Sequence, residues 1–174
     1  MSSLRYSVPL ENNRFARVVE WNGEPRVDLR EWECINSEPV KATKKGVSLD
    51  LIQFKTLTDI LQDYVDESLK KMEAISWHLG ANVFITVQKD NPCVDIRLYW
   101  RPPDKTESVP TRRGLCMRPS EYTTFKQHLE EIKKNLPELQ SVKPCYLRDD
   151  HMNQIGMLRC KHCNPNDYQN WQTW

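Results

Sequence analysis

The sequence predicts an α+β fold made of two tandem β-β-β-β-α units, in which curved antiparallel sheets are completed by a pair of helices. Three observations lead to this prediction. One sequence pattern occurs twice, apolar and polar residues alternate within each copy, and each copy closes with apolar residues at helical spacing.

The duplication is visible when two stretches of nine residues are aligned. PRVDLREWE begins at Pro25, and PCVDIRLYW begins at Pro92. Farther along, KKGVSL from Lys44 aligns with RRGLCM from Arg112, and the offset between the copies has grown by one residue. Apolar helix positions then match in the same order. Three matched stretches in one order indicate a duplicated unit.

Each copy is expected to contain four strands. RFARVVEW, which ends at Trp21, and ANVFITVQ, which ends at Gln88, precede the turn residues Asn22-Gly23 and Asp90-Asn91. The central strand is predicted from the aspartate–arginine motif, VDLR at 27–30 and VDIR at 94–97, in which apolar and polar residues alternate with period two. A loop that contains proline and a basic-basic-glycine turn then lead to a short strand.

The helix of the first copy is predicted from an apolar stripe, formed by Leu57, Ile60, Leu61, Tyr64, Val65, Leu69 and Met72. The corresponding stripe in the second copy consists of Tyr122, Phe125, Leu129, Ile132 and Leu136. Pro119 suits a first helical turn, and Pro137 ends the run. A sheet with one helix leaves apolar surface uncovered, so the two helices are expected to pair as an internal pseudo-dimer.

These boundaries divide the chain into repeats at 14–75 and 81–137, a short linker at Ser76–Gly80, and a C-terminal tail at 141–174. Net charge is +1 over 174 residues, and no apolar run is long enough for a membrane span. The first residues do not resemble a secretory signal, so the six cysteines are expected to be reduced thiols of an intracellular protein.

The tail contains residues of the types that bind zinc. Cys160 and Cys163 have the two-residue gap of a zinc knuckle, and Cys145 with either His151 or His162 would complete four ligands. Structural zinc sites usually contain a second pair with the same close spacing, which this tail lacks, so no metal and no cofactor is predicted. No catalytic motif is present, and no enzyme activity is expected.

In both copies, the aspartate–arginine strand, the basic-basic-glycine turn and the amphipathic helix resemble the positive-cofactor-four family of transcriptional coactivators. The resemblance covers roughly residues 14–137. It implies binding of single-stranded or melted DNA without sequence preference, contacts with transcription-machinery proteins, and a nuclear location. It also implies a dimeric arrangement, which one chain would supply as an internal pseudo-dimer or which a homodimer would supply.

The resemblance carries DNA-contacting roles onto twelve positions: Trp21, Arg30, Lys41, Lys44, Lys45, Gly46, Lys89, Arg97, Trp100, Arg112, Arg113 and Gly114. Cationic side chains would follow the phosphates and aromatic rings would stack on bases, while the glycines would let the backbone approach a phosphate. Three family positions differ, because Glu24, Glu33 and Gln88 replace a lysine, a tryptophan and a stacking aromatic.

Simpler structural roles compete with these assignments. Trp32 and Tyr99 fit a core position as well as a stacking platform. Arg30 and Arg97 can pair with Asp28, Asp95 or Glu31 across strands. The near-neutral charge also fits a second hypothesis, that the duplicated fold is a protein-interaction module that has lost its DNA affinity.

Overall fold

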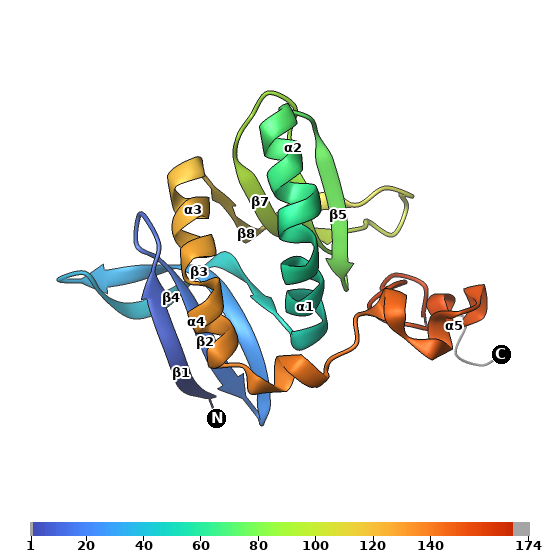
Figure 1. The fold of residues 1–174 in the computed structure, drawn as a ribbon, viewed down its shortest axis with the longest axis horizontal. Coiled ribbons are helices and arrows are strands. Elements are labelled where there is room, and N and C mark those ends of the chain that lie inside the picture. The colour runs from blue at the N-terminus through green and yellow to red at the C-terminus, as the bar shows by residue number, and fades with distance from the viewer. Residues whose placement is uncertain (1, 169–174) are drawn as a thin grey trace.

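The computed structural model describes residues 2–168, which form two open four-stranded antiparallel sheets, each followed by helical segments (Figure 1). The first sheet contains β1 (Ser2–Pro9), β2 (Arg14–Trp21), β3 (Glu24–Ile35) and β4 (Glu38–Leu49), in that order. The second contains β5 (Ile75–Gly80), β6 (Val83–Val87), β7 (Val94–Trp100) and β8 (Val109–Met117). The predicted α+β fold with two tandem units is confirmed.

The first strand of each sheet lies outside the ranges that the sequence suggested for the repeats. β1 precedes residue 14, and β5 occupies the stretch Ser76–Gly80 that was expected to be a linker. That expectation was wrong because residues 75–80 pair with β6, with Trp77 opposite Ile85, and bury Leu79 in the core. The two copies are therefore joined by a turn after the first helical segment rather than by a free linker.

Short turns with left-handed residues connect the strands. Asn22 (φ 51°) and Gly23 (φ 82°) join β2 to β3, as the Asn-Gly pair predicted. Asn36 and Ser37 make the same kind of turn between β3 and β4, with φ of 51° and 65°. This tight turn extends β4 as far as Glu38, so the expected proline-containing loop of the first copy is a strand.

Each copy closes with a broken helix. In the first copy α1 (Leu51–Ile60) runs through a π-helical turn (Leu61–Val65) into α2 (Asp66–Lys71), and the second copy has α3 (Pro119–Gln127) and α4 (Leu129–Lys134). The wider π turn shifts the helical phase of the residues within and beyond it. Tyr64 therefore leaves the predicted core stripe, is 47% exposed, and packs its ring on Trp77 with 4.7 Å between centroids.

The two copies share one hydrophobic core, which contains buried side chains from both sheets and both helical segments. Equivalent residues of the two helices also make hydrogen bonds to the other copy. Gln53 of α1 donates from Nε2 to the carbonyl of Gly80 in the second sheet at 2.8 Å. Its counterpart Glu121 of α3 accepts the backbone N–H of Glu11, in the turn between β1 and β2, at 2.9 Å. Each helix therefore binds the sheet of the other copy, which is the arrangement of a pseudo-dimer.

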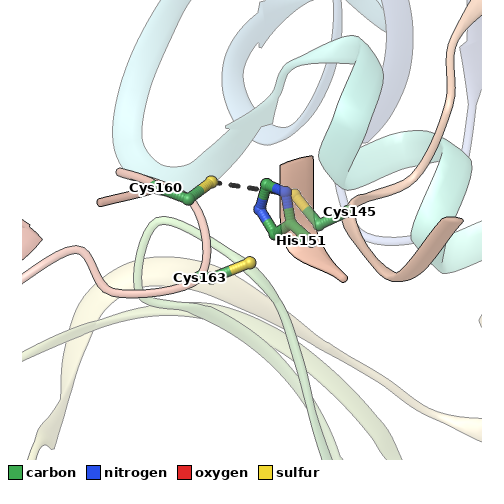
Figure 2. A group of neighbouring side chains, drawn as sticks. All are labelled: Cys145, His151, Cys160 and Cys163. Atoms are coloured by element: carbon green, nitrogen blue, oxygen red, sulfur yellow. Dashed lines mark hydrogen bonds between the residues drawn. The ribbon is translucent and has the colours of Figure 1, made fainter. Parts of the chain in front are cut away.

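The C-terminal segment consists of short turns: 3-10 helices at Pro137–Ser141, Cys145–Leu147 and Asp149–His151, and α5 (Gln154–Leu158). It brings three cysteines and one histidine together (Figure 2). Among the described residues, no helix has the length and apolar character that crossing a membrane requires.

Candidate nucleic-acid interface

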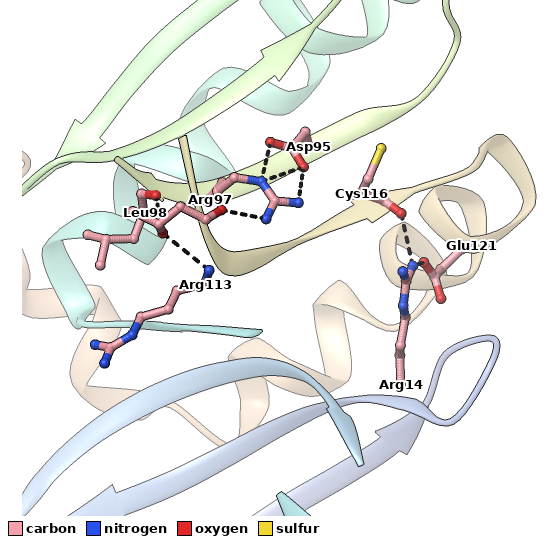
Figure 3. A network of polar contacts seen from close by, with 8 residues as sticks. Arg14, Asp95, Arg97, Leu98, Arg113, Cys116 and Glu121 are labelled. Atoms are coloured by element: carbon pink, nitrogen blue, oxygen red, sulfur yellow. Dashed lines mark hydrogen bonds and ion pairs between the residues drawn. The ribbon is translucent and has the colours of Figure 1, made fainter. Parts of the chain in front are cut away.

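The aspartate–arginine motif of the second copy builds a closed hydrogen-bond network (Figure 3). Arg97 donates from Nε and Nη2 to the Asp95 carboxylate at 2.9–3.2 Å and from Nη1 to the carbonyl of Thr111 at 2.8 Å. The Thr111 hydroxyl donates to the carbonyl of Leu98 and accepts the backbone N–H of Arg113. The hydrogen bond from Arg97 to Asp95 raises the pKa of the guanidinium, so its charge is held beside a compensating carboxylate.

The first copy repeats the network bond for bond. Arg30 donates to Asp28 at 3.0–3.2 Å and to the carbonyl of Thr43 at 2.8 Å. The Thr43 hydroxyl donates to the carbonyl of Glu31 and accepts the N–H of Lys45. The side chains of Arg30 and Arg97 are each only 20% exposed. Both arginines therefore serve mainly to join β3 to β4 and β7 to β8.

The two predicted DNA-approach glycines face protein instead. Gly46 and Gly114 are buried and lie directly opposite the two motif arginines. A Cβ on Gly46 would stand 2.7 Å from Arg30 Cβ, and one on Gly114 would stand 2.5 Å from the carbonyl oxygen of Ile96. These glycines leave room for the arginine side chain and the neighbouring backbone.

Six predicted cationic residues remain exposed: Lys41, Lys44, Lys45, Lys89, Arg112 and Arg113. Within residues 2–168, none of their side-chain nitrogens has a hydrogen bond or ion pair. Five of the six lie on strands β4 and β8 rather than on the expected loops. These are edge strands of their sheets and pack against each other, so the basic residues of both copies lie on neighbouring strands.

The two predicted stacking tryptophans are exposed at the ends of their strands. Trp21 is 54% exposed at the end of β2, and Trp100 is 55% exposed at the end of β7. Strand alternation places Trp21 on the same face as Phe15 and Arg17, away from the core. Alternation also places Trp100 on the opposite side of β7 from Tyr99.

The outward face of the second sheet carries an aromatic cluster that the sequence did not identify. The His78 and Phe84 rings stack with centroids 4.7 Å apart, and Phe84 meets Tyr99 edge to face at 5.0 Å. Burial, together with the nearby His162, lowers the pKa of His78, which favours the neutral ring. Phe84 lies opposite Arg97 in the ladder, so this cluster adjoins the polar network of the second copy.

The first copy has a related but different surface. The guanidinium of Arg17 lies 4.5 Å from the centroid of the Trp32 ring, and Trp32 is half-buried. The outward face is therefore aromatic in both copies. Trp32 and Tyr99 are neither fully buried in the core nor fully open.

Strand register corrects one alignment made from sequence. Phe15 pairs with Arg30 in the first sheet, and Phe84 pairs with Arg97 in the second. In this register Gln88 corresponds to Val19 and not to Trp21, because the hairpin between the paired strands is two residues shorter in the second copy. The signal that could have revealed Phe84 is its match to Phe15, which a constant offset between the copies conceals.

A family model, Transcriptional Coactivator p15 (PC4), matches the chain twice, at residues 8–60 and 77–128. Searches of curated proteins and of solved structures gave no match. The matched segments together cover more than half of the chain; the first contains β2 to α1, and the second contains β6 to α3. The chain therefore belongs to the Transcriptional Coactivator p15 (PC4) family and contains its domain twice in tandem.

Proposed function

We propose that this protein binds single-stranded or melted DNA without sequence preference and acts in the nucleus as a transcriptional coactivator or as a factor that protects single strands. It would work as a binding protein without catalytic activity. The observation that carries this proposal is the placement of unpaired cationic side chains from both copies on β4 and β8, two edge strands that pack together.

The electrostatic part of the proposal rests on Lys44 and Lys45 in the first copy and Arg112 and Arg113 in the second. All four are exposed and have no partner within the described part of the chain. Lysine and arginine in such positions neutralise phosphates and release counterions, which provides affinity that does not depend on base sequence. A net charge of +1 does not oppose this, because a phosphate chain responds to local charge within a Debye length.

The stacking part rests on aromatic rings at the outward faces. Tyr99 and Phe84 are half-buried, which leaves one ring surface accessible while the packing holds the ring in place. Stacking of a base on such a ring contributes about 1–3 kcal/mol and tolerates every base. Trp21 and Trp100 offer larger exposed rings at the ends of their strands.

A second candidate function is a protein-interaction module. The observation in its favour is the hairpin arm of β3 and β4, where Ile35 is 64% exposed and Val40 is 55% exposed. Glu33 lies on the same arm, directly opposite Lys41, and reduces its positive charge. Exposed apolar residues with balanced charge are typical of a protein contact rather than of a phosphate contact.

The decisive experiment measures binding of a fluorescent oligothymidine by anisotropy over a range of salt concentrations. We expect binding at low salt, weaker binding to a fully paired duplex, and an affinity that falls with log salt by about 0.7 for each phosphate neutralised. Combined replacement of Lys44, Lys45, Arg112 and Arg113 by alanine should reduce that slope by roughly 3.

The matched control removes four positive charges from the helical segments, by alanine substitution at Lys70, Lys71, Lys133 and Lys134. It changes the net charge equally but should leave the slope nearly unchanged. The protein-interaction module would be favoured by three results: no binding at low salt, equal affinity for paired duplex, or equal effects of the two sets of substitutions.

A further inference from the structure

The segment after the helices lacks a hydrophobic core of its own. Between residues 145 and 168 the described structure buries no apolar side chain, and His162 is the only residue there that is buried. Met152 is 82% exposed, and Leu147 is 57% exposed. Such a segment cannot hold a fixed fold by apolar burial, so another interaction has to order it.

Four side chains of this segment converge on one point (Figure 2). The ligand atoms of Cys145, His151, Cys160 and Cys163 all lie within 4.8 Å of one another, and each residue is half-buried. The sulfurs of Cys145 and Cys160 are 3.9 Å apart. A tetrahedral zinc with Zn–S bonds of about 2.3 Å places its sulfurs about 3.8 Å apart, which this spacing matches. A disulfide would need about 2.05 Å.

His151 is oriented as a metal ligand. Its Nδ1 lies 2.8 Å from the carboxylate of Asp150. Its Nε2 is buried and has no hydrogen-bond partner among residues 2–168. A carboxylate that holds one ring nitrogen while the other faces a metal is the usual outer arrangement of a zinc-bound histidine. A coordinated metal would satisfy the nitrogen that the protein leaves without a partner.

The backbone around Cys160 is shaped for a metal-bound sulfur. The backbone N–H groups of Cys163 and His162 donate to the Cys160 sulfur. The two-residue gap between Cys160 and Cys163 places these N–H groups at the sulfur. Zinc binds the thiolate form of cysteine, so this turn prepares a ligand.

The other candidate histidine has a different role. His162 Nε2 lies 2.7 Å from Asp50 Oδ2, and its carbonyl accepts the N–H of Ala81 at 2.9 Å. Asp50 is also the N-cap of α1, where its Oδ1 accepts the N–H of Gln53. His162 therefore connects the C-terminal segment to the first helix and the second sheet. Of the two histidines that the sequence offered as a fourth metal ligand, His151 is the one that lies with the three cysteines.

We propose that Cys145, His151, Cys160 and Cys163 form a structural Zn²⁺ site that orders the C-terminal segment against α1 and the second sheet. Four protein ligands close a tetrahedral site and leave no position for a substrate, so its role is structural. Binding releases protons from the cysteine thiols, which makes the affinity rise with pH. This proposal replaces the expectation that the chain carries no metal, and it does not depend on DNA binding.

The test uses the full-length protein, purified without chelator and analysed for metal by mass spectrometry. We expect about one zinc per chain in the wild type, as a site with four protein ligands requires. His162→Gln is the matched control and should keep its zinc, whereas His151→Ala and Cys160→Ser should lose most of it. Cys93→Ser, at a cysteine outside the cluster, should also keep its zinc.

Cobalt substitution of the wild type provides a readout that does not depend on how the variants fold. Co²⁺ in a tetrahedral site with three thiolates gives strong visible absorption and a sulfur-to-metal charge-transfer band. Zinc should displace both. The proposal is overturned if the wild type contains no zinc and its cobalt spectrum is that of the hydrated ion. It is also overturned if His162→Gln loses zinc while His151→Ala retains it.

Discussion

At the scale of single residues, each motif arginine needs the space that the glycine opposite it on the neighbouring strand leaves. Arg30 and Arg97 lie flat over Gly46 and Gly114, and in that position each bonds to an aspartate and a threonine carbonyl. The basic-basic-glycine motif therefore combines two roles. Its glycine accommodates the internal arginine, while the two cations before it remain free for a ligand.

Gly114→Ala tests this arrangement. The added Cβ would stand 2.5 Å from the carbonyl oxygen of Ile96 and 2.7 Å from Arg97 Cα, and both are backbone atoms that cannot move aside easily. We expect a loss of about 1–3 kcal/mol in the free energy of unfolding, as for other overpacked sites. Urea unfolding measures this loss.

Cys116→Ala is the control, because Cys116 is exposed and lies on the same strand and the same face. Its effect should stay within about 0.5 kcal/mol. Equal stability of the two variants would show that Gly114 has no packing role and would favour a role in the approach of DNA instead.

At the scale of elements, each helix is fastened to the opposite sheet by its third residue. Glu121 is 1% exposed and accepts from Arg14 Nη1 at 2.7 Å as well as from the N–H of Glu11 (Figure 3). Gln53 also contacts the opposite sheet without a charge, but as a donor, from Nε2 to the Gly80 carbonyl. The first copy thus shows that an amide can hold this position.

Glu121→Ala leaves the Arg14 guanidinium and a backbone N–H without their partner in a buried place. We expect a loss of about 3–5 kcal/mol, which is typical when one member of a buried ion pair is removed. Glu121→Gln should lose less, because its amide oxygen can still accept one of the two hydrogen bonds. If both variants lose the same amount in urea unfolding, the charge rather than the hydrogen bonds would be responsible.

The helices and strands also show how much of the fold could be predicted from the sequence. Repetition of the motif and the helical spacing of Tyr122, Phe125 and Ile132 were sufficient to predict the tandem units and their shared core, because burial imposes a period on the sequence. The π turn at Leu61–Val65 was not predictable in this way, since a single extra residue in a turn leaves no periodic signal. β5 was missed because it follows the turn after α2 directly, so its residues were read as the connection between the copies.

The candidate interface was predictable only in part, for a related reason. Exposure of Lys44 and Arg112 follows from their charge, and the pairing of the two motif arginines with Asp28 and Asp95 was one of the alternatives read from the sequence. The bonds of these arginines to the carbonyls of Thr43 and Thr111 depend on cross-strand geometry and could not be read in this way. Phe84 was hidden because the hairpin differs in length between the copies, and register cannot be read from one strand alone.

At the scale of the whole molecule, an ion pair joins the first strand to the 3-10 helix that follows α4. Arg5 donates to the Glu138 carboxylate at 2.7–2.9 Å and to Glu20 at 2.9 Å. The hydrogen bond from Arg5 lowers the pKa of Glu138 from 4.5 to about 2. Because the group is partly exposed, solvent screening keeps the stabilisation modest.

This contact makes stability depend on pH in a defined direction. Since the folded pKa of Glu138 lies below its unfolded value of 4.5, its contribution is complete above pH 4.5 and is lost as the pH falls toward 2. We expect Glu138→Gln to lower the melting temperature at neutral pH and the difference from the wild type to shrink below pH 4.5. A difference that stays constant over this range would contradict an electrostatic origin.

The crossed contacts of Gln53 and Glu121 pack the two copies as a pseudo-dimer, and their covalent connection has a consequence for the surfaces they present. Two identical subunits must treat both directions along a nucleic acid alike, whereas two covalently joined copies can diverge independently. Here one half presents Arg17 on Trp32 and the other presents Phe84 on Tyr99. Fusion has therefore allowed the two outward faces to diverge, so the paired sheets have distinguishable ends.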